Sequence, residues 1–161
     1  MNAELTLYAG EIKTLIDKLT ASLDGLDAEQ LNWKPPVADA NSIFVIVTHT
    51  LGNIRAWVLG ICCGQPIDRD RPAEFASSGP NAAPLVERAR ELAREVEDAL
   101  AGLDPSTLDD LREARQRLWG AGTAEPVTGR AAILHAIEHA SEHLGHIGIT
   151  KDLLARAGVS A

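Results

Sequence analysis

The chain has 161 residues, of which 45% are apolar and 4% aromatic, and its formal net charge is −8. This length fits one domain over residues 1–161, and the apolar content excludes a disordered chain. The acidic balance, with Arg interleaved among Glu and Asp, argues against nucleic acid or anionic membranes as partners, because proteins that bind them usually carry a basic patch.

Two long helices are predicted in the first part of the chain. Apolar residues recur at helical spacing over residues 4–23, which predicts the first helix. A short helical turn is expected over residues 26–33, before two prolines force extended backbone. Asn41 or Ser42 is a suitable cap for a second helix that runs to about residue 63. Its first turns are apolar on nearly all sides, which predicts burial on several faces.

Two further long helices are predicted after a long connection. Residues 64–84 are rich in proline and charge, which predicts a surface connection that carries functional contacts. Residues 85–103 show the clearest amphipathic repeat of the chain and predict a third helix. Residues 108–118 have a helical composition but are followed by glycine and proline, so partial helix at most is expected there. Thr128 caps the last helix, which runs to about Arg156.

The order of these elements predicts an all-α fold. Four long helices, with long connections between the second and third and between the third and fourth, are typical of a four-helix bundle. The alternative is an irregular helical domain that uses residues 108–118 as a fifth helix.

The chain shows no sign of export or membrane insertion. Residues 1–6 lack the basic region and apolar run of a secretory signal, and no uninterrupted apolar run approaches the roughly 18 residues of a membrane span. Cys62 and Cys63 are adjacent, which is not the spacing of a zinc knuckle, so we expect small buried or half-buried thiols. These features predict a cytoplasmic protein.

Four of the five histidines lie in the last predicted helix. His135, His139, His143 and His146 fall within roughly a quarter of the helix circumference, and imidazoles four residues apart can point at a common ion. His139 and His143 lie nearest the apolar side, which favours this pair. The competing interpretation is a row of solvated histidines, because such a pair arises easily by chance. A third ligand must come from elsewhere, and His49 is the remaining histidine.

The segments that contain these histidines together resemble the DinB/YfiT-like superfamily. The motifs that carry the resemblance are Val47-Thr-His49-Thr-Leu-x-x-Ile-x-x-Trp57 and Leu134-His-x-x-x-His139-x-x-x-His143-x-Gly-His146. The resemblance extends over nearly the whole chain and implies a four-helix bundle with a divalent metal held by His49, His139 and His143. Zinc or nickel is expected, because imidazole suits both.

One departure from the common family pattern bears on function. Many members continue from the second histidine of the last-helix pair as Arg-Gly-Gln, whereas here Leu144-Gly145-His146 follows and keeps only the glycine. The Gly-His pairing is closer to the branch near mycothiol-dependent enzymes. The resemblance therefore implies a metal-dependent transferase or isomerase that uses a low-molecular-weight thiol, mycothiol or bacillithiol, against an electrophile. The alternative is a non-catalytic helical binding or dimerisation protein with a vestigial or incidental metal site.

Two further expectations concern the surroundings of the metal and the assembly. His135, Glu142 and His146 are candidates for hydrogen bonds that orient the metal-binding imidazoles, because a metal-bound histidine usually donates its other N–H group. For His135 and Glu142 the competing interpretation is a solvated helix edge. Apolar residues on several sides of the second helix predict a homodimer, the commonest closed assembly.

Overall fold

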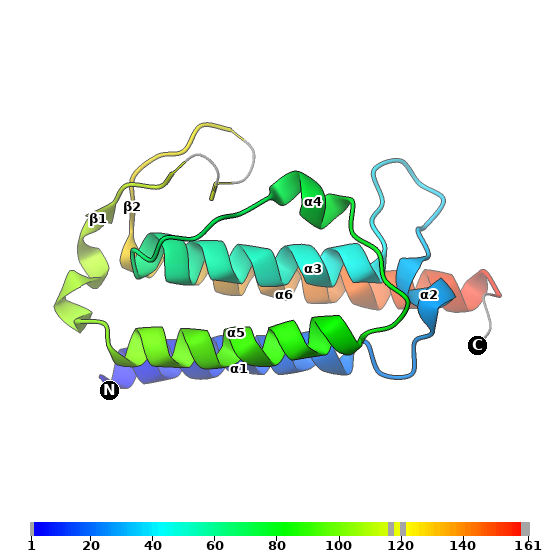
Figure 1. Ribbon diagram of the computed structural model, residues 1–161, viewed down its shortest axis with the longest axis horizontal. Coiled ribbons are helices and arrows are strands. Elements are labelled where there is room, and N and C mark those ends of the chain that lie inside the picture. The colour runs from blue at the N-terminus through cyan, green and yellow to red at the C-terminus, as the bar shows by residue number, and fades with distance from the viewer. Residues whose placement is uncertain (1, 116–117, 120–121, 159–161) are drawn as a thin grey trace.

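Four long helices form a bundle, as the sequence predicts (Figure 1). The computed structural model of the protein describes residues 2–115, 118–119 and 122–158. The long helices are α1 (Ala3–Ala21), α3 (Ile43–Ile54) with its continuation η1 (Arg55–Cys62), α5 (Ala83–Ala101) and α6 (Gly129–Arg156). Helix α1 packs against α5, and α6 packs against both α3 and η1. The space between α3 and α6 positions the candidate site.

The helix starts follow from capping side chains that the sequence shows. The Ser42 hydroxyl accepts a hydrogen bond from the Val45 N–H group at the start of α3, at 3.3 Å. The Thr128 hydroxyl does the same for Ala131 at the start of α6, at 3.1 Å. The expected short turn is α2 (Ala28–Asn32), which begins with a capping box formed by Asp27. Each cap pairs an N–H group that the helix itself cannot satisfy.

The second long helix is buried on all sides in its first part, α3, and changes its winding at η1. Every residue of α3 is buried, and η1 is a π-helix, a rare form that often occurs near functional sites. By length and composition alone Ile43–Cys62 could cross a membrane, but 94% of its apolar window is buried inside the fold. Its apolar character is therefore that of a core helix. At its end Cys62 is buried and Cys63 half-buried, and both are free thiols, as predicted.

The connection between the second and third long helices runs back along the outside of the bundle, so that α3 and α5 point the same way (Figure 1). It carries a short helix, α4 (Arg71–Phe75), which packs on α3. Asp70 caps α4 by accepting a hydrogen bond from the Ala73 N–H group at 3.0 Å. The prediction of a surface connection was incomplete, because Ile67 and Glu74 are buried. A helix of five residues is too short to show a periodic apolar pattern.

The alternative of a fifth helix over residues 108–118 is wrong. A 3₁₀ turn, η2 (Pro105–Asp109), leads into β1 (Leu111–Arg112), which pairs antiparallel with β2 (Val127–Thr128). Within this segment residues 116–117 lie outside the described residues. A helix would need a continuous apolar face against the bundle, whereas the Leu111 side chain is exposed.

Candidate metal centre

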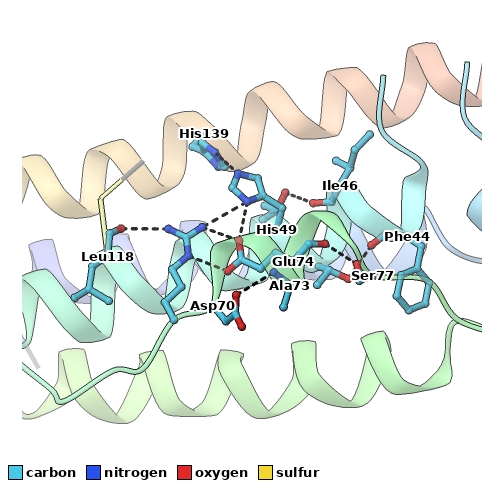
Figure 2. Close-up of polar contacts among 12 residues, drawn as sticks. Phe44, Ile46, His49, Asp70, Ala73, Glu74, Ser77, Leu118 and His139 are labelled. Carbon is cyan, nitrogen blue, oxygen red and sulfur yellow. Dashed lines mark hydrogen bonds and ion pairs between the residues drawn. The ribbon is translucent and has the colours of Figure 1, made fainter. Parts of the chain in front are cut away.

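Three histidines from two helices converge between α3 and α6. His49, His139 and His143 each offer one ring nitrogen, and these atoms all lie within 4.8 Å of one another. The Nε2 atoms of His49 and His139 are 3.2 Å apart, and Figure 2 shows the two rings facing each other. Two nitrogens bound to one tetrahedral zinc ion at about 2.0–2.1 Å would lie roughly 3.4 Å apart. The donor set therefore fits a divalent ion, and the structure brings together the three residues that the sequence singles out.

Local structure explains why these rings meet. His139 and His143 lie one helical turn apart on α6, so both side chains project from one face. Ala136 and Ala140 on the same helix are fully buried, and such small side chains let helices approach closely. His49 comes from the part of α3 that packs against α6.

Burial keeps the imidazoles of His139 and His143 neutral at neutral pH. Burial lowers the pKa of His139 to about 3, with smaller contributions from His143 and His49. Burial also lowers the pKa of His143 to about 4, helped by His49 and His146. A neutral imidazole has a free lone pair, and metal binding requires that form.

A buried carboxylate fixes the orientation of the His49 ring. The Glu74 Oε2 atom accepts a hydrogen bond from the His49 Nδ1–H group at 2.8 Å, so His49 Nε2 is the atom with the free lone pair (Figure 2). Arg69 holds the same carboxylate with both arms of its guanidinium, Nε to Oε1 at 2.8 Å and Nη2 to Oε2 at 2.9 Å. Histidines that bind metals are commonly oriented by a carboxylate in this way.

The charge state of Glu74 follows from these contacts. Burial alone would raise its pKa, but the hydrogen bonds from His49 and Arg69 and the Arg69 charge hold the pKa below its usual value. Neither Glu74 nor Arg69 was identified from the sequence, because both lie in the 64–84 connection. The one sequence signal that could have revealed a helix here was Asp70 followed by Pro72, a pattern that marks a helix start.

The carboxylate can reach this place because residue 52 is glycine. A Cβ atom on Gly52 of α3 would overlap the Glu74 Oε1 atom. The helix backbone and the carboxylate are thus packed directly against each other.

We expect Gly52→Ala to displace Glu74 and to lower both stability and zinc affinity. Overpacking of this kind costs about 1–3 kcal/mol. Thermal unfolding of the metal-free protein and zinc titration measure the two effects. Gly10→Ala in α1 is the matched control, since a Cβ there meets nothing within 4 Å. The control should be neutral or stabilise by up to about 1 kcal/mol. An equal response of the two variants would contradict the packing argument.

The three other residues expected near the metal differ in position. His146 approaches His143, with 3.0 Å between their Nδ1 atoms. The His135 ring lies against Trp57, with ring centroids 3.7 Å apart. Glu142 is exposed, and no hydrogen bond joins it to the three histidines within the described part of the chain. The structure instead places Glu74 at the imidazole of His49.

A cavity of about 470 Å³ opens beside the histidine cluster. Its walls come from α3, η1, α6 and the two long connections, through the residues His49, Asn53, Trp57, Arg69, Arg71, Trp119, Val127, Ala131, His135 and His139. Ala136 and Ala140 do not line this cavity, because both are packed into the core. Arg69 and Arg71, from the 64–84 connection, do line it.

Comparison with known proteins identifies relatives of this chain. A family model described as the DinB superfamily matches residues 11–147. No curated protein sequence gives a significant match. One similar solved structure is YfiT from Bacillus subtilis, described as a probable metal-dependent hydrolase with an unusual four-helix bundle topology. It is 16% identical to this chain with a TM-score of 0.69, and the match covers 98% of this chain and 90% of YfiT.

Two further structures are similar over most of their length. A conserved protein from Enterococcus faecalis is 17% identical with a TM-score of 0.69, covering 96% of this chain and 98% of that one. A DinB-like protein from Bacillus cereus is 15% identical with a TM-score of 0.66, covering 89% and 86%. At these identities the likeness establishes the fold.

Proposed function

Because the chain belongs to the DinB superfamily, we propose that it is a divalent-metal-dependent transferase or isomerase that uses a low-molecular-weight thiol. His49, His139 and His143 are the proposed ligands. Mycothiol or bacillithiol is the proposed cosubstrate, on the strength of the sequence resemblance.

The observation that carries the proposal is the convergence of three histidines, two of which, His49 and His139, line a cavity. Three protein ligands leave coordination positions open, which is the arrangement of catalytic sites, whereas structural sites are closed by four. A zinc or nickel ion held there would supply the Lewis acidity that lowers the pKa of a thiol, so that the nucleophilic thiolate exists at neutral pH. The neutral imidazoles of His139 and His143 suit such an ion.

The lining of the cavity suits a nucleophile that the metal itself activates, such as a thiol. The described lining residues include no Asp or Glu. The nearby carboxylate, Glu74, is already engaged by His49 and Arg69 and so is not free to remove a proton from water. A thiol activated by a metal needs no such base. Hydrolysis is the second candidate, favoured by the description of YfiT and by the same open coordination.

An assay of thiol consumption separates these functions. We expect the zinc-loaded protein to consume mycothiol, bacillithiol, glutathione or cysteine with at least one member of a panel of electrophiles. The rate in His143→Ala should fall by about two orders of magnitude, because a catalytic metal stabilises developing charge by several kcal/mol.

The same panel includes esters and amides incubated without thiol. Hydrolysis without thiol that depends on His143 would establish the second candidate. Equal rates in the wild type and His143→Ala throughout would favour the non-catalytic binding protein. The homodimer, the single domain over residues 1–161 and the cytoplasmic location stay predictions from the sequence.

A further inference from the structure

Buried polar atoms without partners gather around one cavity. Among the described residues, five buried side-chain nitrogen or oxygen atoms lack a hydrogen-bond partner. Four of them belong to residues that line the cavity beside the histidine cluster, namely Asn53 Oδ1, Trp57 Nε1, Arg71 Nε and His139 Nδ1. Folded proteins retain few such atoms, because burial without a partner is destabilising. Their concentration at one place indicates groups that a ligand satisfies.

The charge of the cavity is opposite to that of the protein. The chain has a net charge of −8, yet the described lining holds two guanidinium groups and no carboxylate. The Arg69 charge is balanced by Glu74. Arg71 forms no ion pair with a described residue, and its guanidinium carbon lies 4.7 Å above the centre of the Phe75 ring. An uncompensated cation on a cavity wall favours an anionic ligand.

Phe75 ties this cation to the candidate metal centre. The Phe75 ring contacts both Arg71 and His49, with its centroid 4.6 Å from that of the His49 ring. The cation–π contact holds the guanidinium close to the histidine cluster. An anion bound by Arg71 would therefore lie beside the proposed metal ligands.

Apart from Asn53 and the histidines, the remaining walls are apolar and aromatic. The rings of Trp57 and Trp119 lie 4.9 Å apart between centroids, and Val127 and Ala131 complete this side. The volume of about 470 Å³ is within the range of small-molecule sites. These walls suit an apolar body attached to the anionic group.

We infer that this cavity binds a small organic acid, with a carboxylate paired to Arg71 and an unsaturated or aromatic body against Trp57 and Trp119. The Arg71 Nε–H and Trp57 Nε1–H groups are donors that a carboxylate satisfies, whereas the Asn53 Oδ1 atom is an acceptor and requires a donor elsewhere on the ligand. This inference rests on the proposed function in one respect: the acid is the electrophilic substrate of the same site.

Benzoate is the probe, titrated into the metal-free full-length protein by calorimetry and by tryptophan fluorescence. We expect saturable binding of benzoate, and binding at least about ten-fold weaker in Arg71→Gln, because hydrogen bonds to charged groups are the strong ones. Benzamide has the same shape as benzoate without the charge. It should bind to the wild type about as weakly as benzoate binds to Arg71→Gln. Arg94→Gln, an exposed site on α5 with the same change in charge, should bind like the wild type.

A second variant tests the site if Arg71→Gln fails to fold. Trp57→Phe keeps an aromatic side chain, although a smaller one, and removes the N–H donor, so it should weaken benzoate binding several-fold. The inference is overturned if the wild type does not bind benzoate at about 10 mM, or if Arg71→Gln and Trp57→Phe both bind benzoate as tightly as the wild type does. It is also overturned if inorganic phosphate binds to the wild type more tightly than benzoate.

The metal-free titration keeps the two proposals separable. Benzoate binding without zinc binding would end the proposed function and leave the acid site standing. Thiol consumption that depends on His143, without benzoate binding, would end the acid site and leave the proposed function standing.

Discussion

Replacing His49 or His143 with alanine is expected to abolish stoichiometric zinc or nickel binding. The wild-type chain, purified without chelator or nickel resin, should carry about one ion, because three converging imidazoles with one oriented by a carboxylate form a pre-organised donor set. Either substitution leaves only two imidazole ligands, and two are too few to hold the ion stably. Elemental analysis of the purified variants measures the loss.

A control and an independent readout accompany this experiment. Glu142→Ala removes an exposed side chain that forms no hydrogen bond to the triad within the described part of the chain, and this variant should retain the ion. Zinc should also raise the unfolding temperature of the wild type, since a ligand at about 100 times its Kd stabilises by about 2.7 kcal/mol. His49→Ala and His143→Ala should show no such rise. Full retention of metal by both variants would end the assignment of these ligands.

Glu74→Gln is expected to cause the largest loss of stability among single polar substitutions in this protein. The Arg69 and Glu74 side chains are only 3% and 7% exposed, so the change leaves a guanidinium buried without its counter-charge. Breaking a buried pair in this way costs about 3–5 kcal/mol. The loss of the carboxylate that orients His49 should also weaken zinc binding by about 10–100-fold. Urea unfolding of the metal-free protein and zinc titration measure the two effects.

Glu95→Gln is the matched control. Glu95 pairs with Arg55, and both side chains are 42% exposed, so the same chemical change should cost about 0–1 kcal/mol and leave zinc binding intact. The double variant Arg69→Met with Glu74→Leu removes both charges and should be more stable than Glu74→Gln. Similar losses in Glu74→Gln and Glu95→Gln would show that the buried pair has no special role.

Much of the fold could be predicted because its signals are local. Ser42 and Thr128 cap the helices that follow them, and apolar spacing marks the buried faces of α1 and α5. The proposed metal-binding pair could be predicted for the same reason. His139 and His143 are four residues apart, so the helix alone places them on one face.

The sequence by itself therefore determined the four long helices, the bundle and three histidines suited to a metal, because helix periodicity and capping act within a few residues. The tertiary structure decided what surrounds those histidines. Glu74 lies 25 residues from His49, in a helix too short to be periodic, and reaches its place because Gly52 carries no side chain. The cationic cavity likewise joins Trp57, Arg71 and His139 from three segments. Such contacts depend on packing between segments far apart in the chain, which no local pattern encodes.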